Sequence, residues 1–241
     1  MGPKAARSTK TLGITVACLL SAIASSALAG DIHGTLTVPT DLASLSPPPA
    51  SDEAAARVRY WEEWNGLVDP RPTRVDPARE IAVVLTGEGT LTEANQPPYR
   101  LHNGGLQPAT MVVRVASGFQ IRNDDGCSYE LFAQGLDEIA PVQTAPGNAR
   151  PLTVSAPGHW PLADRNYPHV RGHLHALADL VARAVVEASG AYTFHGVPAG
   201  SYVLHIFHGD HESSSQPVTV TDAALTVPAI QVQAAAAAAA H

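Results

Sequence analysis

The chain has 241 residues, 15% of which are charged, and a formal net charge of −7. Both lysines, Lys4 and Lys10, lie near the start, so arginine is the only strong cation in the rest of the chain. An acidic surface without lysine argues against a nucleic-acid partner, and it excludes Schiff-base chemistry and a Walker-type phosphate site, which need a lysine amine.

Residues 1–29 have the pattern of a secretory signal peptide. Basic residues precede an apolar stretch rich in Ala and Ser, and the Ala-Leu-Ala before Gly30 fits an A-x-A cleavage site. The apolar stretch is too short for a permanent anchor. We therefore expect cleavage after Ala29, a periplasmic or secreted protein, and no transmembrane segment in the mature chain. That mature chain has 12 Arg against 22 Asp and Glu, a formal charge of −10.

Residues 30–96 are expected to form the first part of one β-domain. Apolar residues alternate with polar ones over 31–38, which predicts a strand. The apolar run at 80–86 lacks strict alternation and predicts a central strand covered on both faces. Between these strands, residues 52–64 predict a short helix that docks through its aromatic side chains.

Residues 97–186 consist of short apolar runs joined by turns rich in Gly and Pro, which is typical of a β-sandwich. Two runs lead into a polar turn at 123–126, where Asp124 and Asp125 are expected to bond local backbone amides. The last run, at 180–186, is expected to be the closing strand of this domain.

The turn at 123–126 resembles that of the cupredoxins, plastocyanin-like copper proteins in which a copper-ligating His follows four residues after the Asp of an Asn-x-Asp turn. By this resemblance, the four copper-ligand positions hold Tyr129, Gly172, His175 and Ala178. A blue-copper centre needs two imidazoles, a thiolate and a weak axial ligand. The resemblance therefore implies a cupredoxin-like domain with a degenerate copper site and no cofactor.

Residues 187–233 resemble a different family. Gly-x-Tyr-x-Phe at 190–194 and Val-Pro-x-Gly-x-Tyr at 197–202 are similar to the transthyretin-like, carboxypeptidase-regulatory type of β-sandwich. This resemblance joins 30–96 and 187–233 into one discontinuous domain, with the cupredoxin-like unit inserted in it or docked on it. The combination resembles secreted bacterial proteins described as methylamine-utilisation-like. The predicted fold class is all-β, with two β-sandwiches and one short helix, followed by a poly-Ala tail at 234–241.

Two groups of three histidines lie close together in the sequence: His169, His173 and His175, and then His205, His208 and His211. The rings of His173 and His175 are expected on one face of a strand, where with His169 they would suit Zn²⁺ or Cu²⁺. The second group needs a bend at Gly209 to converge. For both groups, the alternative is structural histidines that are hydrogen-bonded to their neighbours.

The remaining sequence features favour binding over catalysis. Cys127, the lone cysteine of the mature chain, is a small filler, an intermolecular thiol or a soft metal ligand. No G-x-S-x-G, H-E-x-x-H or C-x-x-C motif occurs, so no catalytic residue is assigned. We expect a non-enzymatic binding or envelope-associated module whose loops at 123–129 and 167–178 contact an unknown protein or envelope partner. The alternative is a periplasmic protein that binds zinc or copper.

Overall fold

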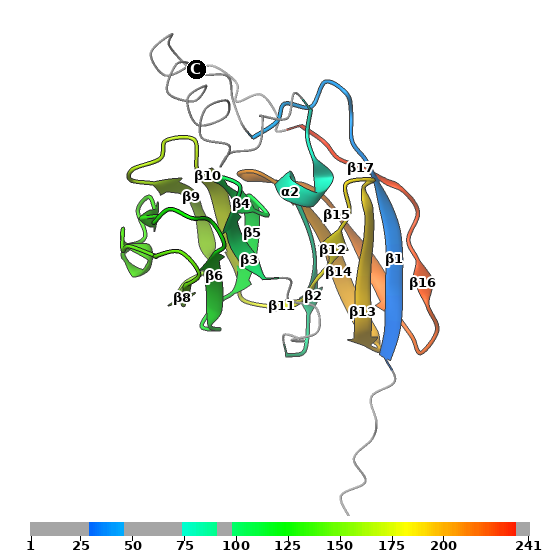
Figure 1. Cartoon of the computed structure of the whole chain (residues 1–241). Coiled ribbons are helices and arrows are strands. Elements are labelled where there is room, and N and C mark those ends of the chain that lie inside the picture. Colours follow the sequence, from blue (N-terminus) through cyan, green and yellow to red (C-terminus); the bar gives the residue numbers. More distant parts are fainter. Residues whose placement is uncertain (1–28, 46–73, 91–97, 235–241) are drawn as a thin grey trace, which may run out of the picture.

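The computed structural model describes residues 29–45, 74–90 and 98–234. The signal peptide predicted at 1–29 (except for its last residue), the helix predicted at 52–64 and the tail beyond residue 234 lie outside the described residues. Within the described part, strands dominate (Figure 1), and the helical elements are one short α-helix, α2 (Pro77–Glu80), and one 3-10 turn, η3 (Asp137–Ile139). The predicted all-β class is confirmed.

The strands of the described ranges form four sheets. The first sheet contains β12 (Val185–Val186), β13 (Ala191–Pro198), β1 (Ala29–Thr37) and β16 (Leu225–Thr226), with β17 (Ile230–Gln231) also paired to β1. The second contains β11 (Leu180–Arg183), β2 (Ile81–Gly87), β14 (Gly200–His208) and β15 (His211–Val220). The third contains β4 (Gly105–Gln107), β3 (Tyr99–His102), β6 (Phe119–Asn123) and β8 (Ala149–Leu152). The fourth contains β5 (Thr110–Arg114), β10 (Arg171–Leu177), β9 (Gly158–Asp164) and β7 (Leu131–Ala133).

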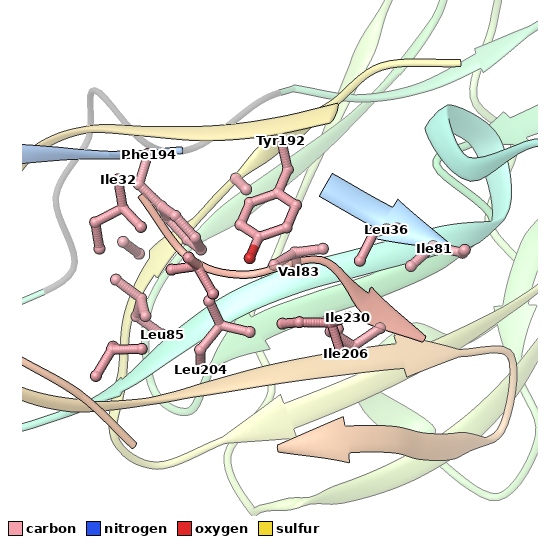
Figure 2. Packing of buried hydrophobic residues seen from close by; sticks show 14 of the residues in the cluster. Ile32, Leu36, Ile81, Val83, Leu85, Tyr192, Phe194, Leu204, Ile206 and Ile230 are labelled. Carbon is pink, nitrogen blue, oxygen red and sulfur yellow. The ribbon is translucent and has the colours of Figure 1, made fainter. Parts of the chain in front are cut away.

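The largest apolar cluster takes most of its side chains from the first and second sheets. Ile32 of β1 and Phe194 of β13 meet Val83 and Leu85 of β2, as Figure 2 shows, and each is at most 1% exposed. Val84, the residue between them on β2, belongs to a separate cluster on the other side of the strand. β2 is therefore covered on both faces, as predicted, which explains why its apolar residues do not alternate with polar ones.

A second apolar cluster joins the third and fourth sheets. Leu101 and Ile121 of the third sheet pack in it with Met111, Leu162 and Leu174 of the fourth. A smaller cluster then joins the second sheet to the fourth. It consists of Val84, Val112, Leu180 and Phe207. The fourth sheet is thus apolar on both sides where it meets these clusters, and this contact positions the candidate site described below.

The prediction that residues 180–186 close the cupredoxin-like unit was wrong. Leu180–Arg183 pairs with β2 of the second sheet, and Val185–Val186 pairs with β13 of the first. The chain passes from the fourth sheet to the second at the turn 178–179. There the carbonyl of Asp179 accepts a hydrogen bond from the N–H of Gly87, the last residue of β2, at 3.0 Å. Leu180 packs in the small cluster and Val181 in the largest one. A strand with apolar residues on both faces is suited to such a doubly covered position.

Candidate functional site

The side chains of the polar turn after β6 form hydrogen bonds with one another and with the β3–β4 turn. The Tyr129 side chain is 2% exposed, and its hydroxyl donates to Asp125 Oδ2 at 2.6 Å. The Asp125 carboxylate also accepts the backbone N–H groups of Asn103 at 2.7 Å and Gly104 at 2.9 Å. Asp125 therefore binds amides of the β3–β4 turn rather than of its own turn, and Asp124 forms ion pairs with two arginines.

These contacts keep Tyr129 a neutral hydrogen-bond donor. Burial raises the pKa of its phenol well above the ordinary value, and the hydrogen bond to Asp125 raises it further. The phenol therefore does not become an anionic metal ligand at neutral pH. Nearby, Cys127 is a half-buried free thiol at the edge of the second cluster, which favours its role as a small filler.

The other positions aligned with copper ligands do not join Tyr129. A Cβ on Gly172 would lie 2.5 Å from the Ala109 carbonyl oxygen and 2.8 Å from the Leu106 side chain, so no cysteine fits there. His175 follows three residues later on the same strand, β10, and therefore points to the opposite face. Ala178 is exposed in the turn after β10. The residues present do not fit a blue-copper ion.

The face of β10 opposite Gly172 carries a group of histidines. His175 is 5% exposed, and its Nε2 donates to the carbonyl oxygen of Gly209 at 2.7 Å. His159 of β9 stacks on His175, with ring centroids 4.6 Å apart. His159 Nε2 also lies 3.1 Å from His173 Nδ1, and the two rings are nearly parallel at 14°. Both His173 and His175 contact the ring of His159, which shows that they lie on the same face of β10, as predicted.

All three rings are neutral at neutral pH. Burial lowers the pKa of His175 to about 4, and it also lowers the pKa of His173 and His159. Each ring therefore has one nitrogen with a lone pair, which is the form of imidazole that binds metals. His159 is solvent-exposed and His173 half-buried, so this pair is open to ions from solution.

Sequence reasoning missed His159. The antiparallel register of β9 and β10 places His159 directly across from His175, and only this pairing reveals it as a neighbour. The predicted third member, His169, instead lies before β10 with its ring against Tyr167, at a centroid distance of 5.9 Å. Across the described residues, no three His, Cys, Asp or Glu side chains are already arranged to hold a metal ion.

The second group of histidines separates into two environments. His205 bonds Thr86 Oγ1 and Glu212 Oε1, each at 2.9 Å. His208 is 3% exposed, and its Nε2 lies 3.6 Å from a buried carboxylate of α2. The bend after β14 does bring the rings of His208 and His211 together, with centroids 6.0 Å apart. His205 is held elsewhere on the sheet, so the three do not form one site.

Comparison with known proteins finds solved structures that resemble part of the chain. A reduced mutant of amicyanin, a cupredoxin, has 10% identity and a TM-score of 0.30 over 39% of this chain and 98% of its own. An oxidized mutant of amicyanin has 13% identity and a TM-score of 0.31 over 40% and 99%. No protein-family model matches the chain, and no curated protein matches it. No helix in the described ranges is long and apolar enough to span a bilayer.

Proposed function

We propose that this chain is an exported, non-enzymatic protein that binds a Zn²⁺ or Cu²⁺ ion through His159 and His173. The observation that carries the proposal is the 3.1 Å distance between His159 Nε2 and His173 Nδ1. Two imidazole nitrogens about 2.0–2.1 Å from one tetrahedral ion lie roughly 3.3 Å apart. The two nitrogens are therefore spaced almost as two ligands of a single ion.

Without metal, one of these neutral rings donates its proton to the other. An ion takes the place of that proton once the donor ring carries its hydrogen on its other nitrogen. Two protein ligands leave coordination positions for water or for a further side chain. Such an open site suits binding or handling of an ion rather than the electron transfer of a blue-copper centre, which needs a thiolate.

The fold-level part of the proposal is that the four sheets form two β-sandwiches. The largest cluster fills the space between the first and second sheets, and the second cluster fills that between the third and fourth. This division supports a transthyretin-like unit joined to a cupredoxin-like unit. Export to the periplasm rests on the signal pattern at 1–29. A protein or envelope partner for residues 123–129 and 167–178 remains a prediction from sequence, although most of the second range forms strand β10 and not the expected loop.

Calorimetric titration of the mature chain with Zn²⁺ and Cu²⁺ tests the metal site. We expect one binding event that is lost in both His159→Gln and His173→Gln. His33→Gln is the matched control, because His33 is exposed on β1 of the first sheet. His169→Gln separates this site from the group predicted by sequence. Absence of binding, or loss of binding only in the His169 variant, would contradict the proposal.

A further inference from the structure

The turn between β14 and β15 lies against the paired histidines. A Cβ on Gly209 would lie 3.7 Å from Cδ2 and 3.8 Å from Nε2 of His173. The Gly209 carbonyl accepts the hydrogen bond from His175, and its N–H donates to Thr110 Oγ1 at 2.9 Å. Because both of its polar backbone groups bond the fourth sheet, this turn has a fixed position beside the rings.

Asp210 follows Gly209 and carries a carboxylate at the same place. Its side chain is 65% exposed and accepts a hydrogen bond from His211 Nδ1 at 3.2 Å. Burial lowers the pKa of His159 and of His173, and the charge of Asp210 opposes that effect at both rings. The carboxylate is therefore within electrostatic reach of the pair, and the side chain that holds it is the half-buried His211.

We propose that Asp210 is the third ligand of the ion bound by His159 and His173. This inference rests on the proposed function. A carboxylate oxygen binds Zn²⁺ at about 2.0–2.2 Å, and two imidazoles with one carboxylate and an open position form a known type of zinc site. The exposed side chain reaches the ion by exchanging its contact with His211 for a metal bond. Rotation is required, since the three groups do not yet converge.

The position of Asp210 in the fold gives this ligand a structural effect. His159 and His173 lie on β9 and β10 of the fourth sheet, whereas Asp210 lies in the hairpin of the second sheet. An ion held by all three residues therefore links the two cluster-forming halves of the molecule. Metal binding would then add to the contact made by the small cluster of Val84, Val112, Leu180 and Phe207.

The test compares Asp210→Asn with wild type and with Asp222→Asn, an exposed aspartate after β15 that serves as a matched control. Asparagine keeps the shape of the side chain and removes its charge. Zn²⁺ affinity is measured by calorimetry, and the Cu²⁺ ligand set by electron paramagnetic resonance. We expect Asp210→Asn to weaken binding by roughly tenfold or more and to change the Cu²⁺ spectrum, with the control unchanged.

The outcomes separate this inference from the proposed function. If Asp210→Asn binds like wild type while the histidine variants do not bind, the pair holds the ion alone and the inference is overturned. A weaker affinity with an unchanged Cu²⁺ spectrum would assign Asp210 a purely electrostatic effect, which also overturns it. If wild type itself binds neither ion, the proposed function fails first.

Discussion

Replacing Tyr192 by Phe removes a buried hydroxyl that lacks a partner. Tyr192 is 1% exposed in the largest cluster, where Figure 2 shows its oxygen pointing into the apolar core. Among the described residues, this oxygen has no hydrogen-bond partner. It lies over Gly34, where an added Cβ would come within 2.3 Å of it, so the glycine leaves space for the hydroxyl.

The magnitude follows from two effects. A buried unsatisfied polar group costs about 1–3 kcal/mol, and loss of the oxygen's packing offsets part of the gain, so Tyr192→Phe should stabilise the protein by about 1 kcal/mol at pH 7. Burial also raises the pKa of Tyr192 to about 12. Because this folded-state pKa lies above the unfolded value near 10, titration of Tyr192 leaves stability unchanged below about pH 10 and lowers it as pH rises through the folded value.

At pH 11 the unfolded chain has therefore ionised this group while the folded chain has not. The wild type should lose roughly 1.4 kcal/mol there, beyond any loss in the Phe variant. Urea denaturation followed by circular dichroism at pH 7 and pH 11 measures both effects. Tyr202→Phe is the control, because the Tyr202 hydroxyl donates to the Pro198 carbonyl at 2.9 Å, and its removal should destabilise at pH 7. If Tyr192→Phe costs 1 kcal/mol or more, or if the difference does not widen at pH 11, this reasoning is refuted.

Three further changes test the closed turn, the close strand contact and the buried carboxylate. Tyr129→Phe should destabilise by about 1.5–3 kcal/mol, since Asp125 loses a charge-assisted hydrogen bond; urea denaturation measures this, and a change below about 0.5 kcal/mol would count against it. Gly172→Ala should cost about 1–3 kcal/mol, because its Cβ would lie 2.5 Å from the Ala109 oxygen; an unchanged melting temperature would be inconsistent with that contact. Burial tends to raise the pKa of Glu80, but the nearby His208 ring and the hydrogen bonds from Leu45 and Ser44 leave it below its usual value. The stability that Glu80 provides is therefore present above its unfolded pKa and lost as pH falls, so Glu80→Gln should flatten the loss of stability on acidification, and equal acid sensitivity in the two proteins would exclude this role.

The sequence was informative where a strand had one or two well-defined faces. Alternation along 31–38 predicted β1, and the unbroken apolar run at 80–86 predicted that β2 is covered on both sides. The same logic placed His173 and His175 on one face of β10. These are local properties of a strand, and they follow from its repeat of two residues.

Relations between strands were not predictable in this way. The closeness of His159 to His173 depends on the register of β9 with β10, which no local pattern specifies. The alignment of Gly172 and His175 with two copper ligands assumed a loop, whereas both residues lie on a continuous strand and face opposite ways. The run at 180–186 has the composition of any buried strand, and only its partners, β2 and β13, determine which sheets it joins.

The order of strand pairing has a consequence for how this chain reaches its native state. β1 pairs with β13, β16 and β17, and β2 pairs with β11 and β14. All the strands that pair with these two early strands therefore come from the last third of the chain. Contacts this distant in sequence form slowly, because a long loop must close first. Both early strands can therefore complete their sheets only after the chain beyond residue 180 is available, so the first and second sheets are expected to be completed late in folding.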